Sequence, residues 1–106
     1  MSRYMRVIVM FDLPTTTAEE RKEYMCFRKY LIRKGYDMLQ YSVYSRIVKH
    51  RDEADSCLFG LQLNIPSSGN VRVLTVTEKQ YAQMKIILGK PTVAEEKVCA
   101  KELIIL

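Results

Sequence analysis

The chain has 106 residues, of which 48% are hydrophobic and 27% are charged, a composition typical of a single globular domain. Its longest apolar runs, VIVMF and LIIL, are far too short to span a bilayer, and its first residues, MSRYMR, do not resemble a signal peptide. We therefore expect a cytoplasmic protein that does not interact with a membrane. Three separated cysteines without a C-x-x-C pair fit reduced thiols, and a single histidine, His50, argues against a His-based catalytic triad.

The net charge of +5 comes from 17 basic and 12 acidic residues, and the basic excess is concentrated in one part of the chain. Between Arg21 and Arg51 there are nine lysines and arginines but only two acidic residues, Glu23 and Asp37. Such a local excess favours a polyanionic partner such as nucleic acid. The alternative is that these side chains form the solvated surface of a basic protein.

The first predicted element is a strand over residues 5–12, MRVIVMFD, that is buried on both faces. Because alternate side chains of a strand point to opposite faces, Asp12 shares a face with Ile8 and Met10. A carboxylate at the edge of a dry core is costly unless another group pairs with it. Asp12 is therefore either a turn device, whose carboxylate accepts backbone N–H groups of the next loop, or a ligand.

A helix is predicted to begin near Ala18, because residues 17–20 read T-x-x-E, the pattern of a capping box. Before it, Pro14 makes the connecting loop stiff and extended. The helix can continue to Lys34, because Gly35 provides a natural C-terminal stop.

This helix has an apolar face and a basic face. Tyr24, Phe27 and Leu31 recur at three- and four-residue spacing and form a stripe for packing on the sheet. At about 100° per residue, five basic side chains gather on the arc opposite that stripe. They are Arg21, Lys22, Arg28, Lys29 and Arg33. They form either a solvated helix face or a set of phosphate contacts.

The elements that follow are shorter. Residues 38–48, MLQYSVYSRIV, form one long bent strand or two short ones, in which we expect Tyr41 and Tyr44 to pack in the sheet rather than to stack on bases. A second helix is predicted over HRDEADSCLFGLQLNI, with Asp52 as its cap. Residues 71–77 read as a strand, followed by a helical turn at EKQYAQM and short strands at KIILG and ELIIL.

The order of these elements predicts an α+β fold, the ferredoxin-like split β-α-β sandwich, with two helices on one face of an antiparallel sheet. We expect a ferredoxin-like domain over residues 1–90 and a tail over residues 91–106, whose terminal strand is available to pair with a partner chain. Helices on one face leave the apolar side chains of the other face uncovered. The simplest cover is another copy of the chain, which predicts a homodimer joined face to face or through the C-terminal strands.

In a twofold dimer, Asp12 and its symmetry mate can meet. One aspartate makes a poor metal site, but two carboxylates with open water positions suit one hard cation, Mg²⁺ or Mn²⁺, shared across the dimer. Water activated by that ion could attack a phosphodiester while nearby arginines stabilise the charge that develops.

Three segments together resemble the CRISPR-associated protein two family, small CRISPR adaptation proteins often described as endoribonucleases: MRVIVMFDLP, ERKEYMCFRKYLIRKGYDMLQYSVYSR and GNVRVLTVTEKQY. The shared pattern is a strand-terminal aspartate before a Pro-containing loop, then a basic helix, Q-x-S-V-Y, and a G-x-V-R-V strand. The resemblance extends over nearly the whole chain. It implies a ferredoxin-like homodimer, often with a C-terminal strand added to the partner's sheet.

For individual residues, the resemblance implies that Asp12 is the catalytic residue and binds a divalent metal between the two protomers. It also implies that Phe11 flanks this site, which the stiff loop at Pro14 supports. Basic residues of the first helix, together with Arg46 beyond it, are then predicted to bind nucleic acid, either double-stranded DNA or single-stranded RNA.

Two functions are compatible with the resemblance. The first is a metal-dependent nuclease that cleaves single-stranded RNA or double-stranded DNA. The second is a non-enzymatic scaffold in spacer acquisition for antiviral defence, a dimer between two dimers of the CRISPR integrase that holds DNA by phosphate contacts. In that case residues 92–106 are the candidate integrase contact. A third reading, a module that binds a small metabolite, finds no Gly-rich phosphate loop in the sequence.

Overall fold

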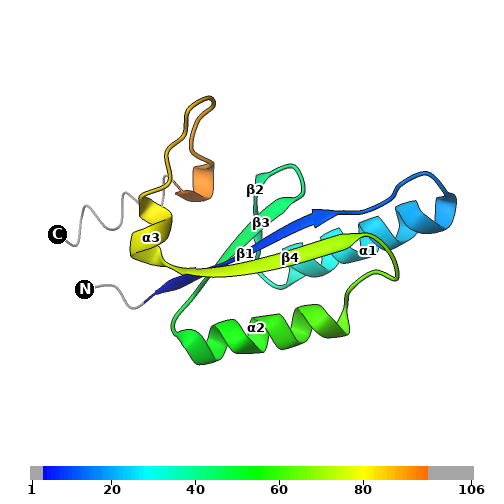
Figure 1. Cartoon of the computed structure of the whole chain (residues 1–106), viewed down its shortest axis with the longest axis horizontal. Helices are drawn as coiled ribbons and strands as arrows, with labels where there is room; N and C mark the ends of the chain where they lie inside the picture. The colour runs from blue at the N-terminus through cyan, green and yellow to red at the C-terminus, as the bar shows by residue number, and fades with distance from the viewer. Residues whose placement is uncertain (1–3, 96–106) are drawn as a thin grey trace.

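The computed structural model describes residues 4–95. Four strands and three helices follow one another along this part of the chain, and two of the strands, joined by a short turn, are consecutive (Figure 1). The strands are β1 (Met5–Asp12), β2 (Asp37–Gln40), β3 (Val43–Val48) and β4 (Asn70–Thr77). The helices are α1 (Ala18–Arg33), α2 (Arg51–Leu63) and α3 (Glu78–Ala82). The prediction of an α+β fold is confirmed.

The four strands form one antiparallel sheet in the order β2-β3-β1-β4, so that β1 is a central strand between β3 and β4. Met5 lies opposite Val48 on one side and Thr77 on the other. At the far end of β1, Asp12 lies opposite Asn70. The end of β1, the turn between β2 and β3, and the start of β4 therefore meet at one end of the sheet.

The hydrophobic core lies between the sheet and the two long helices. Alternate side chains of β1 enter it, with Val7 and Val9 fully buried and Phe11 nearly so. Their partners in the core come from both helices, among them Phe27, Tyr30 and Leu31 of α1 and Ala54, Cys57 and Leu61 of α2. Both helices therefore cover the same face of the sheet (Figure 1). The intervening side chains of β1 point to the opposite face, which we call the open face; Asp12 shares it with Ile8 and Met10, as predicted.

Helix α1 begins and ends as predicted. The Thr17 hydroxyl accepts a hydrogen bond from the Glu20 amide at 3.1 Å, and the Glu20 carboxylate accepts one from the Thr17 amide at 2.9 Å. This capping box satisfies two backbone donors at the start of the helix. The predicted stop, Gly35, has a φ of 89°, the left-handed conformation that ends a helix without steric cost.

The segment over residues 38–48 forms two short strands rather than one bent strand, joined by a turn at Tyr41 and Ser42. Ser42 has a φ of 63°, which few residues other than glycine adopt. Tyr44 packs in the sheet as predicted, but the same prediction for Tyr41 is wrong, because Tyr41 lies in the turn and is 89% exposed.

Two further local predictions need correction. The N-cap of α2 is His50, whose ring Nδ1 accepts a hydrogen bond from the Glu53 amide at 3.3 Å, and not Asp52, which lies in the first turn. The segment KIILG forms no strand; Ile87 and Leu88 in it are almost fully exposed. The predicted terminal strand ELIIL lies outside the described residues.

A buried polar cluster holds the segment after α3 against the open face, at the end of the sheet farthest from Asp12. The Arg6 guanidinium pairs with the Glu78 carboxylate through hydrogen bonds of 2.7 and 3.1 Å. It also lies over the Tyr81 ring, 4.2 Å from the ring centroid. The Tyr81 hydroxyl donates to Glu95 at 2.5 Å, so residues 83–95 return to the sheet. Figure 1 shows this segment on the side of the sheet away from α2.

This cluster predicts a specific loss of stability at high pH. Burial, together with the hydrogen bond to Glu95, raises the pKa of Tyr81 from 10.0 to about 12. Since the folded state disfavours the ionised ring, its stabilising contribution is complete below pH 10.0 and is lost as the pH rises toward 12. Urea denaturation on both sides of this interval should show a larger loss for wild type than for Tyr81→Phe. The variant Tyr41→Phe, at the exposed turn, should follow wild type; equal losses in all three proteins would contradict the assignment.

A second prediction concerns the contact between the two long helices. A Cβ atom added at Gly60 would lie 2.6 Å from the Tyr30 hydroxyl oxygen, so the absence of a side chain permits this approach. We expect Gly60→Ala to lower the free energy of unfolding by about 1–2 kcal/mol. In a Tyr30→Phe background the same change should instead raise it, by up to about 1 kcal/mol, because alanine is the better helix former. Urea denaturation at one protein concentration tests this; the same effect in both backgrounds would rule out the contact.

Candidate functional site

The candidate site is built around Asp12, the last residue of β1. Its side chain is exposed and lies on the open face of the sheet, opposite the two long helices. Among residues 4–95, the Asp12 carboxylate has no hydrogen-bond partner and no basic group within salt-bridge distance. The alternative in which this carboxylate caps the next loop is therefore not found in the structure. A carboxylate exposed without a partner is available to a ligand.

The backbone at Asp12 is held from both sides. The Phe11 amide donates to the Ser42 carbonyl at 3.0 Å, which joins the β2–β3 turn to the end of β1. On the other side, Gly69 approaches so closely that an added Cβ would lie 2.8 Å from the Asp12 carbonyl oxygen. The same added atom would lie 3.1 Å from Cδ of Pro14, so the predicted stiff loop is also packed against this turn. Asp12 is thus presented from a fixed backbone.

Phe11 supports the site from the other face of the sheet. Its ring stacks on Tyr44 at a centroid distance of 5.8 Å and meets Phe27 and Tyr24 edge-on at 5.3 and 6.1 Å. Such aromatic contacts fix the ring and the strand that carries it. Phe11 lies next to Asp12 in sequence, but its ring points into the helix layer and so acts through the backbone.

The structure adds two residues that the sequence did not reveal. Asn70 lies directly opposite Asp12, and Arg72 lies opposite Met10, so all four side chains share the open face. The Arg72 Nε donates to Oδ1 of Asn70 at 3.1 Å. A basic side chain is thereby hydrogen-bonded to the residue that lies opposite Asp12. The alternation in N-V-R-V indicates that Asn70 and Arg72 share one face of a strand. The register that brings this face next to Asp12, however, is a property of the folded sheet.

One chain offers few metal ligands at this site. No group of three or more His, Cys, Asp or Glu side chains comes together within the part of the chain that the structure describes. The oxygens of Asp12 are of the kind that Mg²⁺ and Mn²⁺ prefer, whereas the Asn70 oxygen is already used by Arg72. The donor set of residues 4–95 therefore fits a hard cation only if a second carboxylate is supplied from outside this part of the chain.

The predicted nucleic-acid residues fall into two groups. Three of them have partners within the chain: Arg21 donates to the carbonyls of Thr15 and Thr16, Arg28 to the Tyr44 hydroxyl, and Arg46 pairs with Glu53 at 3.5 Å. The other three, Lys22, Lys29 and Arg33, are exposed and follow one side of α1.

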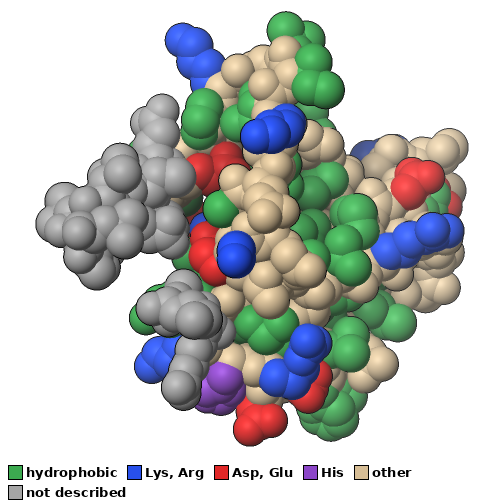
Figure 2. Space-filling view, turned by 60° about the vertical axis from the view of Figure 1, so that its left-hand side comes forward, with side chains coloured by type: hydrophobic (Ala, Val, Ile, Leu, Met, Phe, Trp, Pro, Cys, Tyr) green, Lys and Arg blue, Asp and Glu red, His purple; other side chains and the backbone are tan. Residues whose placement is uncertain are grey.

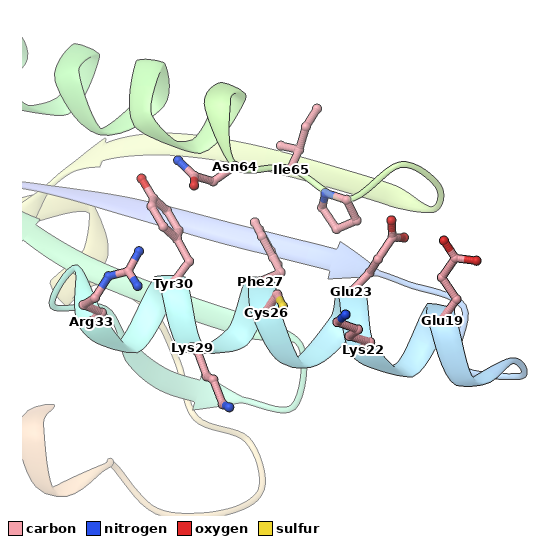
Figure 3. Close-up of a pocket in the computed structure, with 11 residues that line it drawn as sticks. Glu19, Lys22, Glu23, Cys26, Phe27, Lys29, Tyr30, Arg33, Asn64 and Ile65 are labelled. Carbon is pink, nitrogen blue, oxygen red and sulfur yellow. The ribbon is translucent and has the colours of Figure 1, made fainter.

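These three line an open groove of about 580 Å³ between α1 and the end of α2 (Figure 3). The acidic Glu19 and Glu23 also line this groove, and Glu23 accepts hydrogen bonds from Ser67. In Figure 3 the Phe27 and Tyr30 rings point from α1 toward the α2 side of the groove, whereas Lys29 points away. The groove lies in the helix layer, so its basic residues and Asp12 are on opposite faces of the sheet.

The comparison with known proteins identifies the family. The family model described as CRISPR associated protein Cas2 matches residues 5–84. The chain belongs to the Cas2 family. It is 48% identical to the CRISPR-associated endoribonuclease Cas2 of Acidovorax ebreus, over 93% of this chain and 97% of that protein. It is 55% identical to the protein of the same name from Treponema denticola, over 81% and 85%. The Ligilactobacillus salivarius Cas2 is 45% identical over 96% of this chain and its own full length.

The matched region of this Cas2 chain contains every residue of the Asp12 end of the sheet, from β1 to β4. The segment after α3 lies mostly beyond it. Within residues 4–95, no helix has the length and apolar character needed to cross a membrane.

The turn at Gly69 provides a test of how firmly Asp12 is held in this Cas2 chain. Gly69 and Gly89 have similar φ values, 103° and 106°, but an added Cβ meets nothing within 4 Å at Gly89. Alanine at either position therefore carries the same backbone strain, roughly 1 kcal/mol. Gly69→Ala should lower the free energy of unfolding by at least about 1 kcal/mol more than Gly89→Ala, and should shift the backbone NMR signals of Asp12. Equal losses would mean that the turn does not press on the Asp12 backbone.

Proposed function

We propose that this protein is a homodimeric CRISPR nuclease that acts in spacer acquisition and uses Asp12 to bind one Mg²⁺ or Mn²⁺ ion between two protomers. The observation that carries the proposal is the Asp12 carboxylate itself, exposed without a partner at the rigid end of the central strand. Its relatives in Acidovorax and Treponema carry the name CRISPR-associated endoribonuclease, which supports phosphodiester cleavage as the reaction.

The open face supports a homodimer. Leu74, on this face of β4, is 52% exposed, and its diagonal neighbour on β1, Met10, is half-buried. Ile87 and Leu88 in the loop after α3 are 96% and 95% exposed, and Figure 2 shows hydrophobic side chains at the top of the molecule, where this loop rises. A second copy that covers these side chains removes apolar area from water. The strand order β2-β3-β1-β4 with two helices on one face supports the ferredoxin-like assignment.

A twofold axis near Asp12 would bring the Asp12 carboxylate of the second protomer to the same place. The site would then have two carboxylates instead of one. When bound, a divalent ion supplies an activated water and offsets the charge of a phosphate group. The role of Asp12 is to hold that ion at a defined place, and the role of Phe11 and Pro14 is to keep the backbone of Asp12 in position. Cleavage adds water across the phosphodiester: a bond forms from the water oxygen to phosphorus, the bond to the leaving oxygen breaks, and that oxygen gains a proton.

One observation favours a second function, a non-catalytic scaffold that bridges integrase dimers. The exposed basic residues Lys22, Lys29 and Arg33 lie in the helix layer, on the other face of the sheet from Asp12. Duplex DNA held there by phosphate contacts would not need Asp12. The two functions use different surfaces and are separable by mutation.

The deciding experiment is cleavage of labelled single-stranded RNA and duplex DNA with Mg²⁺ or Mn²⁺, with a chelator as blank. Asp12→Asn should lower the rate by roughly a hundredfold or more, because it removes the carboxylate charge without changing side-chain size. The exposed Asp55 of α2 provides the matched control, and Asp55→Asn should cleave like wild type. Titration with Mn²⁺ should find one ion per two chains in wild type and none in Asp12→Asn, with the dimer verified by light scattering.

The scaffold is tested by binding of the same duplex. The double variant Lys29→Glu/Arg33→Glu should weaken binding and lower its salt dependence, whereas Lys79→Glu on α3 should not. Cleavage that is absent from wild type, or equal in wild type and Asp12→Asn, would sink the nuclease and leave the scaffold. If the double variant binds the duplex as well as wild type does, the α1 groove is not the surface that binds DNA.

A further inference from the structure

Arg72 lies on the same face of the sheet as Asp12, on the neighbouring strand. In the β1–β4 register Asp12 faces Asn70 and Met10 faces Arg72, so Arg72 is the diagonal neighbour of Asp12. Diagonal positions on antiparallel strands are about 7–8 Å apart, which a long side chain spans. Arg72 is exposed and forms no salt bridge within residues 4–95.

The hydrogen bond to Asn70 gives the Arg72 side chain a direction. It uses the Nε–H donor, which faces the Oδ1 atom of Asn70 at 3.1 Å, and it draws the guanidinium toward the residue that faces Asp12. The two terminal nitrogens, with four N–H donors, have no partner in the part of the chain that the structure describes. A guanidinium with free terminal donors matches a phosphate group in a bidentate manner.

The surroundings make Arg72 different from the other basic residues. Arg21, Arg28 and Arg46 are engaged with groups of their own chain, and Lys22, Lys29 and Arg33 lie on the opposite face. On the open face, Arg6 is buried in its pair with Glu78 at the far end of the sheet. Arg72 is therefore the exposed arginine that β1, β3 and β4 present on the open face near Asp12.

We propose that Arg72 binds the phosphate group of the nucleic-acid strand presented to Asp12, with Asn70 as its positioning residue. The inference rests on the proposed function in one respect, that the strand is cleaved at Asp12. Bound in this way, Arg72 offsets the negative charge that builds on the phosphate oxygens as water attacks phosphorus. It supplies positive charge to a site whose own carboxylate would repel the substrate.

The first measurement is binding without cleavage. Fluorescence anisotropy of a labelled single-stranded RNA in chelator, over a range of salt concentrations, reports affinity and the number of phosphates that the protein neutralises. Arg72→Gln should weaken affinity by roughly tenfold and make the slope of log affinity against log salt shallower by about 0.7, the change expected on a single strand when one phosphate is no longer neutralised. Arg72→Lys keeps the charge but not the paired donors, and should fall between. The control Arg51→Gln alters an exposed arginine at the other end of the sheet and should bind like wild type.

The second measurement is cleavage by the same variants with metal present. Arg72→Gln should lower kcat by roughly 10- to 100-fold. Asn70→Ala leaves the charge in place and should lower kcat less, while Ser68→Ala in the adjoining turn should change nothing. The positioning role of Asn70 also predicts the result of a double variant. Adding Asn70→Ala to Arg72→Gln should not reduce kcat further, because the two residues act as a unit.

These outcomes separate the inference from the proposed function. If wild type cleaves nothing, the nuclease fails, and the binding series alone decides whether Arg72 binds phosphate. If Arg72→Gln binds and cleaves within twofold of wild type and Arg51→Gln, the role of Arg72 in phosphate binding is refuted. Light scattering shows whether Arg72→Gln is still a dimer. If this variant loses RNA binding because the dimer dissociates, Arg72 is an interface residue and the inference is overturned. Additive effects in the double variant would refute the role of Asn70.

Discussion

The alternation of side chains along β1 is the constraint on which the rest of the structure depends. β1 is central and pairs with β3 and β4 along its two edges, and its two faces have different surroundings. Val7, Val9 and Phe11 are sealed under two helices, whereas Ile8, Met10 and Asp12 face the other way. A shift of one residue in register would turn the Asp12 carboxylate toward the helix layer, at the cost of removing a charge from water.

The rigidity of the strand end explains how an exposed carboxylate can be a defined site. Exposed side chains lose conformational freedom when they bind, and a fixed backbone reduces what remains to be ordered. Here the Ser42 carbonyl and the turn at Gly69 hold the two sides of β1, and the ring of Phe11 anchors it from below. The left-handed conformation of Ser42 is a local strain of order 1 kcal/mol, maintained where it positions the end of β1.

The sequence was informative wherever the physical cause is local. The capping box at Thr17, the stop at Gly35 and the alternation that places Asp12 on the open face all depend on residues within a few positions of each other. It was wrong at Tyr41, because alternation alone does not say where a strand breaks into a turn. It missed Arg72 because the register that joins Asn70 to Asp12 links residues far apart in the chain. His50 capped α2 unexpectedly because an imidazole nitrogen accepts the same hydrogen bond as a carboxylate.

The same alternation that positions Asp12 also places the charged residues of the molecule on two different faces of the sheet. The exposed basic side chains that line the α1 groove lie in the helix layer, on the other face of the sheet from Asp12; they are Lys22, Lys29 and Arg33. Arg72 is different, because it reaches the open face from β4. A phosphate held by Arg72 is on the side where a second chain would bring its own Asp12. In the proposed homodimer, the twofold arrangement would set the number of carboxylates near that phosphate, so that the dimer would be part of the site and not merely a source of stability.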